Sequence, residues 1–152
     1  MAKLSTEFLY EVSVDLETPQ NVGATPHGNR QIFNVKGGTF EGPKVRGEVL
    51  PGGGDWFVFR PDGAGELDVR ATVRTDDGHL IYTYYRGILN ASPEVLQRIA
   101  AGETVDPSEY YFRTTPVFET SSEKYGWLNR IVAVGVGRVK ANWVGYSVYA
   151  VL

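Results

Sequence analysis

The residues best able to do chemistry in this sequence are two carboxylates, an arginine and a tyrosine between residues 55 and 82. Asp55 follows three glycines in PGGGDWFVFR, and Asp68 and Arg70 share one side of the alternating run at 65–74. Tyr82 lies in the next such run. A carboxyl group removed from water can act as a general acid or base, a nearby arginine can stabilise an oxyanion, and a tyrosine can donate a proton. These four residues are the candidate catalytic set.

A second group of side chains combines rings with hydrogen-bonding groups, which suits a flat aromatic or hydrophobic ligand. Its members occur next to Asp55, in the run EYYFRTTPVFET and in the segment TSSEKYGWLNR at 120–130. An alternative for 120–130 is a loop that plugs one end of the fold through Trp127. The candidate ligand-binding residues are Trp56, Arg113, Phe118, Glu119, Tyr125, Trp127 and Asn129.

Several other chemistries have no support in the sequence. The chain has no cysteine, and its two histidines, His27 and His79, are not spaced as metal ligands, so we predict no metal site and no cofactor. The glycines precede no helix and no lysine of a phosphate-binding loop. The formal net charge of -3 excludes a basic footprint for nucleic acid. No stretch reaches the roughly 20 apolar residues of a membrane span, so we expect a cytoplasmic protein with no membrane partner.

The spacing of apolar residues predicts that strands must position these side chains. Apolar and polar residues alternate from Phe8 to Val14, and similar runs recur between glycine-rich turns. The further predicted strands are at about 30–36, 44–50, 55–60, 65–74, 79–88, 109–119, 130–138 and 142–151. One helix is predicted at about 92–102, from the capping Ser92 and Pro93 to the glycine stop at Gly102. The polar segment 17–29 is expected to be a long mobile loop or a flap at the mouth of the barrel.

The number of strands and the absence of a βα rhythm predict the fold class. About nine strands with tight turns favour an all-β, closed antiparallel meander barrel of one domain, residues 1–152, because closure removes exposed sheet edges. The sequence does not decide which face of the 65–74 strand points into the barrel. Either Asp68 and Arg70 face the barrel interior, where they could clamp a ligand, or they face water, as alternation in antiparallel sheets commonly means.

Four motifs in this order resemble those of a known family. They are GGTFEGPKVRGEVLPGGGDW (38–56), LDVRATVRTDDGHLIY (67–82), YYFRTTPVFET (110–120) and KYGWLNR (124–130). The chain is similar, from about Phe8 to its end, to the family of domain of unknown function 3237. The resemblance implies a lipocalin-like (calycin-type) closed barrel, frequent association as a dimer and no assigned activity. Ala71 departs from the family, which commonly has an aromatic residue at this position.

Three functions remain as alternatives. The first is a barrel that binds a small aromatic or hydrophobic molecule. The second is a cofactor-independent hydratase, lyase or isomerase that uses a buried carboxylate with an arginine and a tyrosine. The third is a structural domain that forms a homodimer through strands with two covered faces. A cavity lined by rings alone would favour binding, whereas a shielded acid within it would favour the enzyme.

Overall fold

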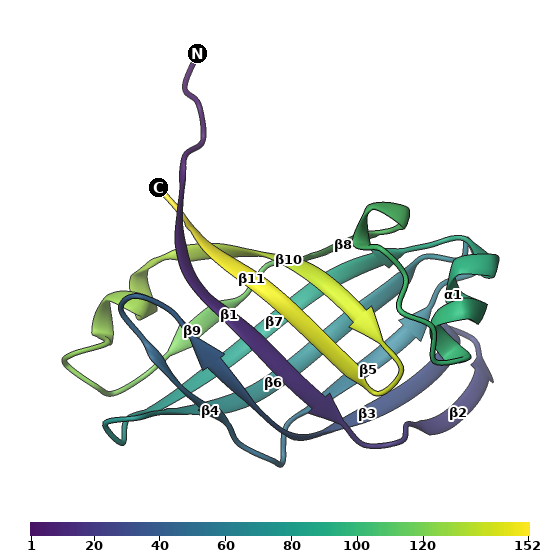
Figure 1. The fold of residues 1–152 in the computed structure, drawn as a ribbon, viewed down its shortest axis with the longest axis horizontal. Helices are drawn as coiled ribbons and strands as arrows, with labels where there is room; N and C mark the ends of the chain where they lie inside the picture. The colour runs from purple at the N-terminus through teal and green to yellow at the C-terminus, as the bar shows by residue number, and fades with distance from the viewer.

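The computed structural model describes all 152 residues and has eleven strands in one sheet that closes into a barrel (Figure 1). The strands are β1 (Thr6–Leu16), β2 (Gln20–Thr25), β3 (Gly28–Glu41), β4 (Arg46–Val49), β5 (Gly54–Phe59), β6 (Gly65–Thr75), β7 (Leu80–Asn90), β8 (Tyr111–Thr114), β9 (Val117–Glu119), β10 (Val132–Lys140) and β11 (Trp143–Val151). The helices are α1 (Pro93–Ala100) and the short 3-10 turns η1 (Pro107–Glu109) and η2 (Gly126–Arg130).

The barrel wall has eight positions because two of them are each shared by two short strands. The long β3 pairs with β5 along its first half and with β4 along its second half. In the same way β7 pairs with both β8 and β9. All pairings are antiparallel, and the β6–β7 pairing closes the ring. The prediction of a closed antiparallel barrel with one α-helix is confirmed.

Three predictions of local structure were wrong. The strand predicted at about 30–36 continues to the end of β3 at Glu41. The segment at 17–29 is not a free loop, because β2 forms a hairpin with the start of β3. The predicted strand at 109–119 is interrupted between β8 and β9 at Pro116, since proline has no N–H to donate to a ladder. The helix begins as expected, with the Ser92 hydroxyl accepting a hydrogen bond from the Val95 N–H at 3.2 Å.

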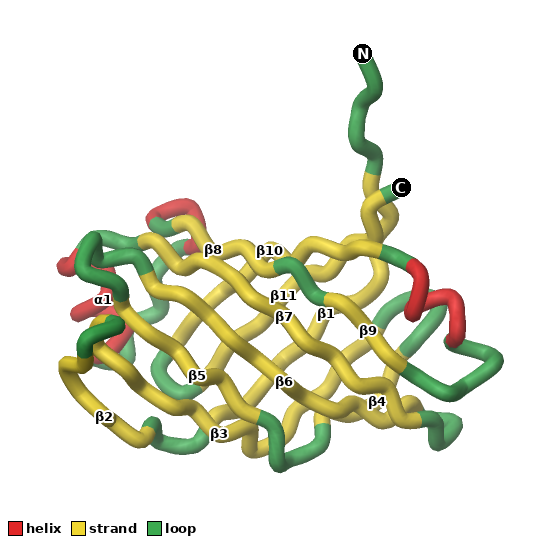
Figure 2. The backbone as a smooth tube through the Cα atoms, turned by 180° about the vertical axis from the view of Figure 1, so that it is seen from behind, coloured by secondary structure: helices red, strands yellow, loops and turns green.

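The two ends of the barrel are closed differently. Helix α1 and β2 lie at one end, and η2 lies at the opposite end together with the β6–β7 turn (Figures 1 and 2). None of the helices is long and apolar enough to cross a membrane.

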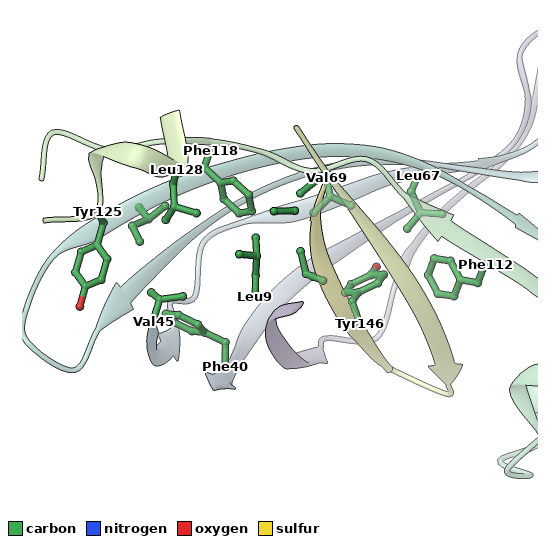
Figure 3. Packing of buried hydrophobic residues seen from close by; sticks show 14 of the residues in the cluster. Leu9, Phe40, Val45, Leu67, Val69, Phe112, Phe118, Tyr125, Leu128 and Tyr146 are labelled. Atoms are coloured by element: carbon green, nitrogen blue, oxygen red, sulfur yellow. The ribbon is translucent and has the colours of Figure 1, made fainter. Parts of the chain in front are cut away.

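The burial of alternate side chains shows which face of β6 points into the barrel. Leu67, Val69 and Ala71 are buried, whereas Arg70 is exposed. The apolar row therefore faces the interior, where Leu67 and Val69 join a cluster with Phe112 and other core side chains (Figure 3). The charged row of β6 lies on the outer surface.

Candidate functional site

A chamber of about 500 Å³ occupies the α1 end of the barrel. This volume lies in the range of pockets that hold small molecules. Fourteen of its 20 lining residues are hydrophobic. The rings come from β3, β5, β8 and β11 and are Phe33, Phe57, Phe59, Phe112 and Trp143.

Helix α1 covers part of the chamber because it is amphipathic. Leu96 and Ile99 line the chamber. Val95 and Ile99 also pack against Val105 in a small separate cluster that attaches the helix. Gln97, on the exposed part of the helix, lies at the edge of the opening.

Two strand glycines make room for the rings of the chamber wall. A Cβ atom at Gly137 would lie 2.5 Å from Phe112 Cγ, and one at Gly65 would lie 2.3 Å from Phe57 Cζ. Any side chain at either position would displace the ring. Isolated glycines within predicted strands were the available sequence signal for such close approaches.

Asp55 is the one carboxyl group among the lining residues. Asp55, Phe57 and Phe59 are alternate residues of β5 and all face the chamber. Asp55 precedes Phe59 by four residues and therefore lies roughly 13 Å from it along the strand, on the side away from the α1 end. Its direct cross-strand neighbours are Phe33 on β3 and Val69 on β6. The carboxyl group therefore lies deep in an apolar part of the chamber.

Asp55 accepts a backbone hydrogen bond where the pairing between β5 and β6 is interrupted. The β5–β6 register holds at Asp55↔Val69 and resumes only at Val58↔Glu66. In the gap, Asp55 Oδ1 accepts a hydrogen bond from the Asp68 N–H at 3.0 Å and takes the place of a backbone acceptor. Asp55 Oδ2 remains free to contact a ligand.

The surroundings of Asp55 change its protonation. Burial raises the pKa of this carboxyl from its ordinary 3.8 to about 7, and the charge of Asp68 adds to the rise. The hydrogen bond from the Asp68 N–H and the positive charge of Arg30 act in the opposite direction and are outweighed. Near neutral pH, Asp55 can therefore either donate or accept a proton.

Three tyrosines lie in the interior beyond Asp55. Tyr10, Tyr85 and Tyr146 line a second, small cavity of about 40 Å³. The rings of Tyr85 and Tyr146 are 5.4 Å apart at an edge-to-face angle of 74°, and the Tyr146 hydroxyl is buried without a hydrogen-bond partner. Burial raises the pKa of all three hydroxyls, so they are neutral proton donors. The sequence did not identify these three tyrosines. Tyr85 is the direct cross-strand neighbour of the inward-facing Val69, but this relation follows from the strand register.

The other three candidate catalytic residues do not join Asp55 in the chamber. Arg70 is on the outer face, where its guanidinium lies 5.5 Å from the centre of the Tyr84 ring. Tyr82 is 36% exposed, and Asp68 is half-buried with Oδ1 buried and unpaired. The alternative in which Asp68 and Arg70 form a clamp inside the barrel was wrong, because inward parity on β6 belongs to Leu67 and Val69.

The candidate ligand-binding residues are distributed over two other regions. Trp56 is 39% exposed on the outer face, and Arg113 lies outside with its guanidinium 5.1 Å from the Tyr111 ring centre. Phe118 is buried in the core, although an outer groove of β6, β7 and β9 also reaches it. That groove is lined by Arg70, Tyr82, Tyr84, Val117, Phe118 and Glu119.

The remaining three candidates, Tyr125, Trp127 and Asn129, belong to the plug formed by residues 120–130 at the end opposite the chamber. Asn129 accepts a hydrogen bond from the Thr120 N–H at 2.7 Å and donates one to the Thr120 carbonyl at 2.9 Å. Leu128 is 2% exposed within the core, whereas Trp127 is only half-buried. The plug interpretation of this segment agrees with these contacts, but Leu128 and Tyr125, rather than Trp127, are its buried side chains.

Asp77, in the β6–β7 turn, holds the plug from outside. The Tyr125 hydroxyl donates to Asp77 Oδ1 at 2.9 Å, and Lys124 Nζ lies 2.5 Å from Oδ2. The hydrogen bond from Lys124 is the main cause that lowers the pKa of Asp77, and those of Thr75 and Tyr125 add to it. No three His, Cys, Asp or Glu side chains are grouped so that they could hold a metal ion.

Fold and site together define a class: a closed antiparallel β-barrel with an apolar chamber at one end and a single carboxyl group inside it. The chain belongs to the family described as protein of unknown function (DUF3237), whose model matches residues 4–151. It is 37% identical over 142 residues to the UPF0311 protein CA_C3321 of Clostridium acetobutylicum, covering 92% of this chain and 90% of that protein.

Solved structures are similar over the whole chain. The conserved protein of unknown function RPA1785 from Rhodopseudomonas palustris is 34% identical, with a TM-score of 0.95 and full coverage of both chains. A β-barrel-like protein from Acinetobacter baumannii AYE is 40% identical, with a TM-score of 0.87 and coverage of 100% of this chain and 98% of the other. An enzyme from Penicillium herquei is 21% identical, with a TM-score of 0.75 and coverage of 100% and 97%, and shows a shared fold.

Proposed function

We propose that this protein binds a small, flat, mostly apolar molecule in the chamber at the α1 end, with Asp55 contacting a polar group of that molecule. The observation that carries the proposal is a chamber of about 500 Å³ with ring side chains around one deep carboxyl group. Phe33, Phe57 and Phe112 supply flat apolar surface, and burial of a ligand against such surface is favourable by roughly 25 cal/mol per Å² of apolar area. Asp55 supplies direction, because Oδ2 is free of hydrogen bonds from the chain.

Replacing Leu67 by tryptophan tests this proposal. Leu67 lines the chamber and is 2% exposed, so a larger ring there should occupy the ligand volume. With coumarin as the probe and calorimetry as the measurement, we expect Leu67→Trp to weaken binding by about tenfold or more, the loss of roughly 1.4 kcal/mol.

Leu80→Trp is the matched control, because Leu80 is 56% exposed outside the chamber. Ala100→Trp introduces the same ring at the chamber opening from the exposed surface of α1, without changing the core. Folding of each variant is checked by circular dichroism. Equal coumarin affinities of wild type, Leu67→Trp and Ala100→Trp would contradict the proposal.

A second function is favoured by one observation, the pKa of Asp55 near 7 in an apolar chamber. A carboxyl group of this kind is suited to general acid–base catalysis, and Tyr85 and Tyr146 are neutral donors in the same interior. This supports the alternative of a cofactor-independent hydratase, lyase or isomerase with Asp55 as the acid–base group. Arg70, the candidate for stabilising an oxyanion, does not line the chamber, and Lys140 is the one cationic side chain among the lining residues.

A further inference from the structure

Three polar residues that line the chamber, Gln97, Lys140 and Asn142, are exposed, so they belong to its rim. Inside the rim, only one part of the wall is polar. Gln31 on β3 lines the chamber together with Asp55 on β5. The opposite wall, from β8, β10 and β11, contributes Phe112, Val139 and Val144. A ligand with a polar edge therefore has one favourable orientation, with that edge toward β3 and β5.

The strand register brings Gln31 next to Asp55. Asp55 pairs with Phe33, and Gln31, two residues before Phe33, pairs with Phe57. Gln31 and Asp55 are thus diagonal neighbours on one face of an antiparallel pair, at a separation of about 7 to 8 Å, within reach of long side chains. Both side chains point into the chamber, as Phe33 and Phe57 do.

Neither group is fully used by the chain itself. Asp55 Oδ1 accepts the Asp68 N–H, which leaves Oδ2, and the Gln31 amide lies half-buried at the chamber surface with no partner among the side-chain hydrogen bonds of this wall. A side-chain amide offers both a donor and an acceptor. A ligand that left these groups without partners would bear the cost of desolvating them.

From this juxtaposition we propose that Gln31 and Asp55 form a two-point recognition site for a ligand with an adjacent N–H donor and carbonyl acceptor on a flat ring, such as a lactam. The proposal rests on the proposed function, because it needs the chamber to be the binding site. The Gln31 amide oxygen accepts the ligand N–H, and the protonated Asp55 carboxyl donates to the ligand carbonyl. The pKa of Asp55 near 7 supports this arrangement at mildly acidic pH.

Two probes of nearly equal shape separate the contributions. Quinolin-2(1H)-one has a lactam N–H beside its carbonyl, whereas coumarin has a ring oxygen in place of the N–H. At pH 6 we expect wild type to prefer the quinolinone by about three- to tenfold, the usual worth of one net hydrogen bond. Gln31→Leu should remove this preference and leave coumarin affinity within about twofold of wild type.

Asn34→Leu is the matched control, because Asn34 is an exposed amide on the same strand with the opposite parity. It should keep the preference for the quinolinone. Equal affinity of wild type for both probes, or an equal preference in Gln31→Leu, would overturn the two-point site while coumarin binding sensitive to Leu67→Trp still upheld the chamber. Absence of binding of both probes to wild type would overturn the proposed function and this inference together.

Discussion

Asp55 shows how one residue obtains its chemistry from its neighbours. A carboxyl group after a glycine turn is ordinary in sequence, but the position of this one between Phe33 and Val69 inside the barrel shields it from bulk water. Since the folded protein has the raised pKa, it retains a proton between about pH 4 and pH 7 that the unfolded chain has released. The free energy of unfolding therefore falls as pH rises through this window, and the loss is complete above pH 7.

The Asp55→Asn variant should lack this loss, because asparagine does not ionise and can still accept the Asp68 N–H. We expect the variant to be more stable than wild type at pH 8.5, by at most about 4 kcal/mol for a shift of three pKa units, and nearly equal to it at pH 4. Urea unfolding from pH 4 to 8.5 measures the difference. Parallel curves for the two proteins would contradict the assigned burial of Asp55.

For the Asp77→Asn variant, the difference from wild type in the free energy of unfolding should show the opposite pH dependence. The hydrogen bond from Lys124 lowers the pKa of Asp77, so wild type should lose this stabilisation as pH falls below about 4, and the variant should not.

At the scale of elements, the plug at 120–130 depends on a few contacts that only the fold creates. The motif KYGWLNR contains two apolar side chains in succession, and the 3-10 turn η2 directs Leu128 into the core and leaves Trp127 half-buried. Lys44 Nζ, from the β3–β4 connection, lies 5.6 Å from the Trp127 ring centre. The plug is therefore anchored by Leu128 and Tyr125 inside and by the hydrogen bonds of Asn129 at its periphery.

This arrangement predicts an order of stability for two variants. Leu128→Ala should lower the free energy of unfolding by about 3 kcal/mol, because it leaves a cavity in the core. Trp127→Ala should cost about 1 kcal/mol, because the ring is only partly buried against the core. Denaturant unfolding at pH 7 gives both values, and a larger loss for Trp127→Ala would show that the indole is the main anchor.

At the scale of the whole molecule, the outer surface of β6, β7 and β8 carries tyrosine and arginine side chains that belong neither to the core nor to the chamber. Tyr82 and Tyr111 are exposed on it, and neither Arg70 nor Arg113 forms an ion pair there. Tyrosine and arginine are enriched at the centres of protein interfaces. The homodimer expected from the sequence is consistent with this surface and stays a prediction.

Light scattering after size exclusion tests the dimer. We expect a mass of twice the 16.8 kDa of one chain, and we expect Tyr111→Glu to shift the distribution toward the single chain by placing a charge on the outer surface. Lys36→Glu, on an exposed part of β3, is the control for added charge. A single-chain mass for wild type at micromolar concentration would contradict the homodimer.

The sequence by itself determined the local structure of this protein. Period-two alternation located most of the strands, although not β2 or the break between β8 and β9. Glycine-rich segments located the turns, and Ser92 with Pro93 located the helix, because each signal acts between residues close in the chain. Alternation also separated the two faces of β6 correctly.

Only the tertiary structure decided which face of β6 is inside and which residues meet in the chamber. Ring closure between β6 and β7 turned Leu67 inward and placed Arg70 in water. Phe33 and Gln31, which neighbour Asp55 in the chamber, lie more than 20 residues before it in the chain. Strand register brings them close to it. A carboxyl pKa depends on the surrounding dielectric and charges, so the chemistry of Asp55 exists only once the barrel has closed around it.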